Sequence, residues 1–153
     1  MSSTDALLIA GVLGQSTVLG ANLFEYVVVV PNWRQPGGVA AYRALMRRRH
    51  PGHFFQTLVP ATVVVLLAAL VVALLTDGPV VLIATALATV VVAEAFTLLY
   101  FMPRNRALFL APVEAEPGAR SMRLVNEWAV AAAIRIVLIA VGVLASLVGL
   151  AVH

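Results

Sequence analysis

The sequence predicts an all-α membrane protein, a bundle of four transmembrane helices with a short interfacial helix in its first long loop. Of the 153 residues, 62% are hydrophobic and 11% are charged, whereas soluble domains average about half apolar and a quarter charged. The apolar residues gather in four segments, each long enough for the roughly 20 residues that cross a bilayer. This composition excludes a soluble enzyme and a disordered tail. The absence of cysteine excludes a disulfide scaffold.

The four segments are expected to form one integral membrane domain over residues 1–153. Lipid offers no water to unpaired backbone groups, so each segment is expected to be helical. The predicted spans are residues 6–30, 54–75, 80–102 and 128–152. Pro31 is expected to follow the first helix, and Pro103 to end the third. Pro60 is expected to kink the second.

The arginines predict the orientation of the bundle. All ten basic residues are arginine, and nine of them lie in the loops after the first and third spans. Because positively charged loops stay in the cytoplasm, both long loops are predicted to be cytoplasmic and both termini outside. The exclusive use of arginine and the richness in alanine and valine indicate a bacterial gene and the bacterial inner membrane. Residues 39–49, which end in three arginines, are expected to form the interfacial helix on anionic headgroups rather than a nucleic-acid site.

Ionisable side chains inside a bilayer are costly and typically mark function. By the rise of the helix, Glu94 lies roughly 12 Å, Arg135 roughly 10–11 Å and Glu25 roughly 7–8 Å from the cytoplasmic end. Their similar depth predicts a cavity open toward the cytoplasm, with these three as the catalytic candidates. An alternative stays open, in which Arg135 and Glu94 form a buried ion pair that only fixes helix register.

Further polar and aromatic residues surround these three in the same half of the bundle. The predicted substrate-binding residues are Asn22, Tyr26, His53, Gln56, Tyr100, Asn105, Asn126 and Trp128. His50 and His53 have a spacing that a helix could present to a metal ion, but Pro51 lies between them and disfavours a regular helix. Neither a metal nor another cofactor is therefore expected.

Four stretches of sequence, taken in order, resemble a family of small four-helix membrane proteins that includes fungal anthrone oxygenases. They are residues 22–26 (NLFEY), 50–56 (HPGHFFQ), 102–108 (MPRNRAL) and 126–128 (NEW), with Arg135 seven residues after the tryptophan. The resemblance implies a membrane enzyme of secondary metabolism that acts on an aromatic polyketide. It would convert an anthrone to an anthraquinone with dioxygen and without a cofactor.

Three hypotheses about function are compatible with the sequence. In the first, the chain is an enzyme for a hydrophobic aromatic or polycyclic molecule, in which Arg135 stabilises a phenolate or enolate and Glu94 or Glu25 is the general base. In the second, the same pocket belongs to a non-catalytic binding or carrier module for a lipophilic metabolite. In the third, the chain is a structural helical subunit. The expected partners are a lipophilic small molecule, membrane lipids and a second copy of the chain, but not nucleic acid.

Overall fold

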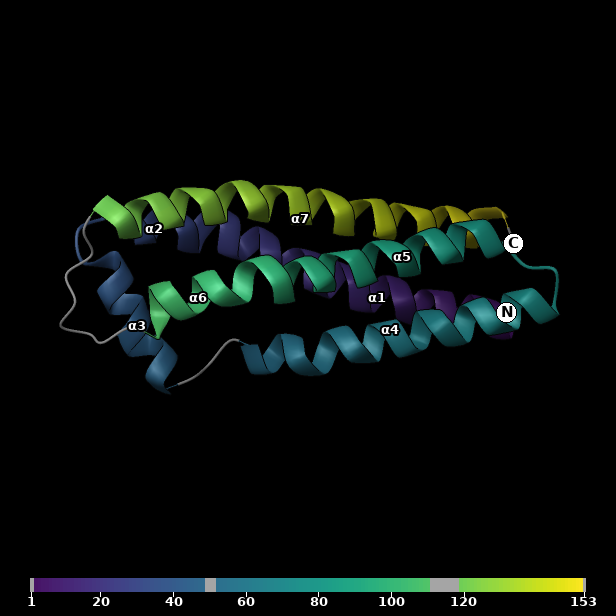
Figure 1. Cartoon of the computed structure of the whole chain (residues 1–153). Helices are drawn as coiled ribbons and strands as arrows, with labels where there is room; N and C mark the ends of the chain where they lie inside the picture. The colour runs from purple at the N-terminus through teal and green to yellow at the C-terminus, as the bar shows by residue number, and fades with distance from the viewer. Residues whose placement is uncertain (1, 49–51, 111–118, 153) are drawn as a thin grey trace.

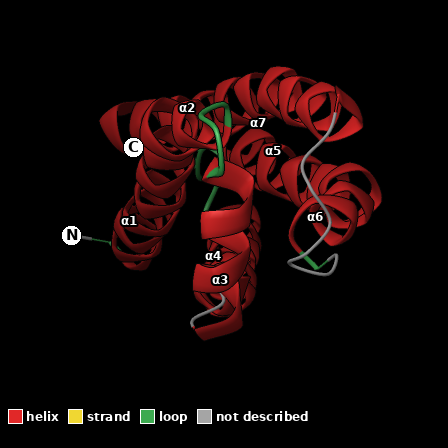
Figure 2. Ribbon diagram, turned by 90° about the vertical axis from the view of Figure 1, so that its left-hand side faces the viewer, coloured by secondary structure: helices red, strands yellow, loops and turns green. Residues whose placement is uncertain are grey.

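The computed structural model describes residues 2–48, 52–110 and 119–152, and within these ranges it is helical, with no strand (Figures 1 and 2). Four long helices run side by side, and all are long and apolar enough to cross a membrane: Ser3–Trp33, Gly52–Leu75, Val80–Phe109 and Ala119–Val152. The prediction of an all-α bundle with four spans is confirmed. The N-terminus and the C-terminus are marked at one end of the bundle, and helix α3 (Gly38–Arg48) lies at the other, which is called the loop end below (Figure 1).

The first and third long helices are each built from three segments. The first consists of α1 (Ser3–Phe24), a π-helical turn (Glu25–Val29) and α2 (Val30–Trp33). The third consists of α5 (Val80–Phe96), a second π-helical turn (Thr97–Phe101) and α6 (Met102–Phe109). The other two long helices are α4 (Gly52–Leu75) and α7 (Ala119–Val152).

Neither Pro31 nor Pro103 ends its helix, so the predicted ends at residues 30 and 102 were wrong. Each proline instead lies in the first turn of the last helical segment, α2 or α6. A π-helical turn precedes each of them, in which the amide of Val30 bonds to the carbonyl of Glu25, and that of Met102 to that of Thr97. This shift of the hydrogen-bond register lets the helix continue past a residue that has no amide hydrogen.

Helix α3 (Gly38–Arg48) is the short helix predicted in the first loop, and it lies across the loop end of the bundle (Figure 2). The turn before it requires glycine twice. Gly37 has a φ of +75°, and a Cβ on Gly38 would collide with the carbonyl of Asn32. Arg43 then holds α3 in place, because its buried Nε donates a 2.6 Å hydrogen bond to the carbonyl of Leu108 at the end of α6.

The helices pack closely in the half of the bundle that carries the termini. A Cβ on Gly11 would lie 2.7 Å from a methyl carbon of Leu66, so glycine is what lets α1 approach α4. Deeper in the bundle, Gln15 joins three helices. Its Nε2 donates to the carbonyl of Ala86 at 3.2 Å, and its Oε1 accepts from Ser146 Oγ at 2.9 Å.

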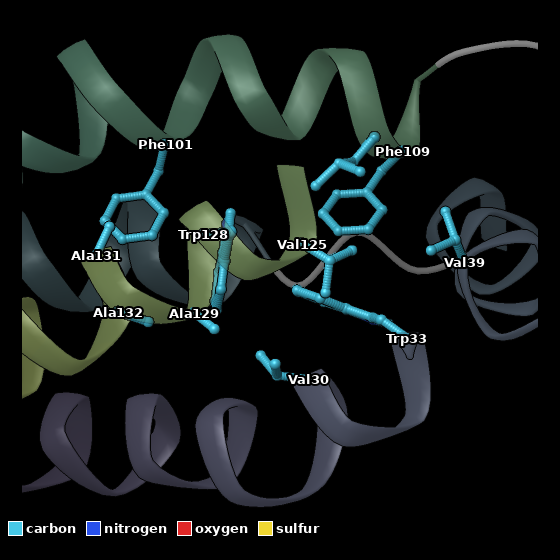
Figure 3. Close-up of a cluster of buried hydrophobic side chains, with 11 residues drawn as sticks. Val30, Trp33, Val39, Phe101, Phe109, Val125, Trp128, Ala129, Ala131 and Ala132 are labelled. Atoms are coloured by element: carbon cyan, nitrogen blue, oxygen red, sulfur yellow. The ribbon is translucent and has the colours of Figure 1, made fainter. Parts of the chain in front are cut away.

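The loop end of the bundle holds a cluster of buried aromatic rings (Figure 3). Trp33 packs against Trp128 and Phe109, with ring centroids 4.9 and 4.8 Å apart. Trp128 also packs edge-on against Phe101 at 5.1 Å. These rings join α2, α6 and α7, and thereby close one side of the bundle near α3.

Candidate functional site

A cavity of about 230 Å³ lies between the helices in the half of the bundle nearest the long loops. Residues from all seven α-helical segments and from both π-helical turns line it. Its volume lies somewhat below the usual range of small-molecule pockets, roughly 300–1,000 Å³. Seven of the residues singled out from the sequence are among its lining: Asn22, Glu25, Gln56, Glu94, Asn105, Trp128 and Arg135.

Arg135 is held from two sides by the two π-helical turns. Its Nη2 lies 3.6 Å from Oε2 of Glu25, and its Nη1 donates to Thr97 Oγ1 at 3.2 Å. Glu25 and Thr97 are the first residues of their turns. The guanidinium carbon also lies 4.1 Å from the centre of the Phe101 ring, in a cation–π contact. A buried guanidinium is therefore fixed at the wall of the cavity, and its ion pair is with Glu25 rather than with Glu94.

Glu94 lines the cavity three residues before Thr97, on α5. Within the described residues it has neither a hydrogen bond nor an ion pair. The positive charge of Arg135 acts on it across the cavity without direct contact. A half-buried carboxyl group that faces a cavity and has no hydrogen bond is able to exchange a proton with a bound molecule. Glu25, by contrast, is engaged by Arg135.

Three buried polar atoms of cavity-lining residues have no hydrogen-bond partner among the described residues. They are Asn22 Oδ1, Trp33 Nε1 and Arg135 Nε. The amide nitrogen of Asn22 is used, since it donates to the carbonyl of Val18 at 2.8 Å. Buried polar groups are rarely left unpaired, because each costs about 1–3 kcal/mol. A bound molecule or water in the cavity would offer these atoms partners.

Trp128 and Asn105, which both line the cavity, are joined by a hydrogen bond. The indole Nε1 of Trp128 donates to Asn105 Oδ1 at 2.8 Å. This bond joins α7 to α6 and fixes the orientation of both side chains. Of the two tryptophans in the chain, Trp128 thus has its indole nitrogen satisfied, whereas Trp33 does not.

The reasoning from sequence missed Trp33, Tyr42, Met46 and Thr97, which also line the cavity. Tyr42 and Met46 come from α3, whose position across the bundle end carries no local sequence signal. Burial, together with the negative charge of Glu25, raises the pKa of Tyr42 to about 12. Tyr42 therefore presents a neutral phenol, which is a hydrogen-bond donor over the whole physiological range.

Four predicted substrate-binding residues do not line the cavity: Tyr26, His53, Tyr100 and Asn126. Tyr26 and Asn126 are exposed on the outside of the bundle. The ring of Tyr100 lies 3.5 Å from the guanidinium carbon of Arg104 and belongs to that contact instead. His50 lies outside the described residues, and in the part of the chain that is described no group of three metal-ligating side chains comes together.

Comparison with known proteins identifies one family. The family described as anthrone oxygenase matches residues 46–145, which is more than half of the chain. The matched range contains Glu94, Thr97 and Arg135, whereas Asn22, Glu25 and Tyr42 precede it. No curated protein and no solved structure matches the chain. On the extent of the family match, this chain is a member of the anthrone oxygenase family.

Proposed function

We propose that this chain is a membrane oxygenase that oxidises an anthrone-type substrate, a polycyclic phenolic ketone, with dioxygen in the cavity. One observation carries the proposal: a fixed guanidinium and a carboxyl group that has neither a hydrogen bond nor an ion pair among the described residues line the same intramembrane cavity. The family membership supports an oxygenase-type reaction. In the overall reaction a methylene carbon becomes a carbonyl, and dioxygen supplies that oxygen and the oxygen of one water molecule.

Glu94 is the general base in this proposal. It takes a proton from the methylene carbon that lies opposite the carbonyl of the anthrone. The electron pair of the broken C–H bond moves into the ring system, and negative charge appears on the carbonyl oxygen. Arg135 stabilises that oxygen, because a guanidinium remains charged and presents several donors.

Dioxygen then takes up electrons from the carbanion. A C–O bond forms at the former methylene carbon, and protonation yields a hydroperoxide. Loss of the remaining proton from this carbon, with cleavage of the O–O bond, leaves the new carbonyl and water. The substrate itself supplies the electrons. The protein contributes a base, a fixed positive charge and a cavity within the membrane-spanning part of the bundle.

Glu25, Asn22 and Asn105 have positioning roles in the proposal. Glu25 holds Arg135 and balances its charge. Asn22 offers a buried acceptor for a substrate hydroxyl. Asn105 holds Trp128, whose ring forms part of the cavity wall.

Oxygen uptake by the purified protein supplied with anthrone tests this proposal, with a protein-free sample as the reference for spontaneous oxidation. Uptake is expected for the parent and is lost in Arg135→Ala and in Glu94→Gln. Glu127→Gln is the matched control, because Glu127 pairs with Arg104 and Arg123 and does not line the cavity. Full turnover in both Arg135→Ala and Glu94→Gln would contradict the mechanism.

A binding or carrier module for a lipophilic metabolite is the second candidate. The unpartnered atoms of Asn22 and Trp33 favour it, since binding alone would satisfy them. Saturable binding of anthrone without oxygen uptake would support this candidate over the enzyme.

A further inference from the structure

We propose that the substrate enters the cavity sideways from the bilayer, through an opening between α4 and the segment that follows α5. This inference rests on the proposed function only for the identity of the substrate. The opening, called the portal below, is formed by Gln56 on α4 and by Leu98 and Met102 on the other side. All three line the cavity and are also exposed on the outside of the bundle. The exposed fractions of Leu98 and Met102 are 57% and 37%.

The portal exists because two neighbouring helices diverge. Helix α4 packs against α1 and α5, whereas α6 packs against α3 and α7. Toward the loop end, α4 therefore lacks the extensive contact with α6 that it has with α5. No described helix lies between α4 and α6 when the bundle is viewed from the loop end (Figure 2).

Two other described walls of the cavity are closed. At the deep end, the hydrogen bonds of Gln15 to Ala86 and Ser146 join α1, α5 and α7. Near α3, the side chains of Trp33 and Phe109 are buried against each other. Lining residues reach the surface at the portal and, beyond Met102 toward the loop end, at Arg106 and Leu110.

The portal lies at the boundary between acyl chains and headgroups. Counted along the third long helix from Val80, Leu98 lies roughly 27 Å and Met102 roughly 33 Å along the axis. The two residues therefore lie on either side of the inner edge of a hydrocarbon core about 30 Å thick that begins near Val80. Counted along α4 from Leu75, Gln56 lies at roughly 29 Å. A flat aromatic molecule with phenolic groups concentrates at this depth, since its rings prefer lipid and its hydroxyls prefer the headgroups.

The path inward from the portal leads to the proposed reacting groups. Leu98 follows Glu94 by four residues, so the two side chains lie on one face of the helix, one turn apart. A molecule that passes Leu98 next meets the carboxyl group of Glu94. Met102 and Gln56 give the portal a rim that is apolar on one side and polar on the other. Such a rim fits an amphiphilic ring system better than a fully apolar lipid chain.

The portal can be tested with cysteines introduced one at a time at two neighbouring positions, because the chain has no cysteine of its own. Leu98→Cys and Leu99→Cys would each be prepared in vesicles, once unmodified and once alkylated with N-benzylmaleimide. Leu99 is the matched control: it is 80% exposed but does not line the cavity. Both tryptophans line the cavity, so their fluorescence reports its occupancy. The probe is 1,8-dihydroxyanthraquinone delivered from vesicles, and the rate of quenching is measured after rapid mixing.

Alkylation at position 98 is expected to slow quenching by about tenfold, which corresponds to an added barrier of roughly 1.4 kcal/mol. Alkylation at position 99 is expected to leave the rate within about a factor of two, a change too small to indicate a blocked path. Equal effects at both positions, or none at either, would overturn the portal. So would the absence of quenching in the unmodified proteins, since the quinone would then not reach the indoles from the bilayer.

The outcome is separate from that of the proposed function. If alkylation at position 98 slows quenching but the protein takes up no oxygen, the portal is supported and the proposed oxygenase activity is rejected. Oxygen uptake that is insensitive to alkylation at position 98 would keep the enzyme and reject the portal.

Discussion

Arg135 on α7 and Glu25, the first residue of the π-helical turn after α1, form an ion pair within the membrane-spanning part of the bundle. Their Nη2 and Oε2 atoms lie 3.6 Å apart, and the side chains are only 10% and 18% exposed. Glu25 lies where α1 changes into a π-helical turn. Thr97 lies at the equivalent point of the third long helix, and its uncharged hydroxyl accepts a hydrogen bond from the same guanidinium. Such π-helical turns occur frequently at functional sites. Two helices thus use the same local distortion, followed by a proline, to hold one arginine.

Removal of Arg135 is expected to reduce stability as well as turnover. Arg135→Ala leaves the carboxylate of Glu25 buried without its partner, and breaking a buried pair in this way costs about 3–5 kcal/mol. The double variant Glu25→Gln/Arg135→Gln removes both charges. We expect it to recover most of the thermal stability in detergent, but not the oxygen uptake. Recovery of both would show that the pair has only a structural role.

Glu94→Gln, unlike Arg135→Ala, should lower turnover without lowering stability. Because Glu94 has no hydrogen bond or ion pair within the described residues, its replacement is expected to leave the melting temperature close to that of the parent. Loss of a general base lowers the rate by about 10²–10⁴-fold. Oxygen uptake and thermal unfolding measured on the same sample distinguish this profile from that of Arg135→Ala. A Glu94→Gln protein that unfolds readily would point to a packing role instead.

The pKa of Tyr42, raised to about 12, predicts a specific pH dependence. The folded protein holds this proton more tightly than the unfolded chain, whose tyrosine has a pKa of 10.0. The contribution to stability is therefore complete below pH 10 and is lost as the pH rises through about 12. In a titration followed by tyrosinate absorbance, Tyr42→Phe should remove the component that appears at the highest pH.

Glu25→Gln provides the complementary titration, because the negative charge of Glu25 is the second cause of the raised pKa. It should move the last component to lower pH without removing it. Burial is the larger cause, so a shift above pH 10 should persist. An unchanged titration in Glu25→Gln would mean that Tyr42 and Glu25 do not interact.

The helices and the polar half of the bundle could be predicted because both follow from local sequence. Apolar length predicts a span, and the helical rise places Glu25, Glu94 and Arg135 at similar depths. The three do line one cavity. The rise predicts depth but not which side chain meets which. The sequence suggested Glu94 as an ion-pair partner of Arg135, whereas the structure pairs Arg135 with Glu25.

The errors have physical causes. Proline normally ends a helix, and no composition signal marks the π-helical turns that carry the chain past Pro31 and Pro103. Tyr26 neighbours Glu25 in sequence, but successive residues on a helix point about 100° apart, which places Tyr26 outside the cavity. Tyr42 reaches the cavity only because α3 folds across the bundle end, and this packing depends on the bond from Arg43 to Leu108.

The side-chain oxygen of Asn22 is expected to make the cavity prefer a hydroxylated substrate. Its Oδ1 is buried at the cavity without a hydrogen-bond partner among the described residues, whereas its Nδ2 is bound to Val18. A substrate hydroxyl that donates to Oδ1 would gain about 1 kcal/mol relative to an analogue without it. Asn22→Leu keeps a side chain of similar size and removes the acceptor. It should weaken binding of 1,8-dihydroxyanthraquinone by about fivefold, the equivalent of that energy, and leave binding of unsubstituted anthraquinone unchanged. If binding of both ligands weakens equally, Asn22 shapes the cavity but does not form a hydrogen bond with the substrate hydroxyl.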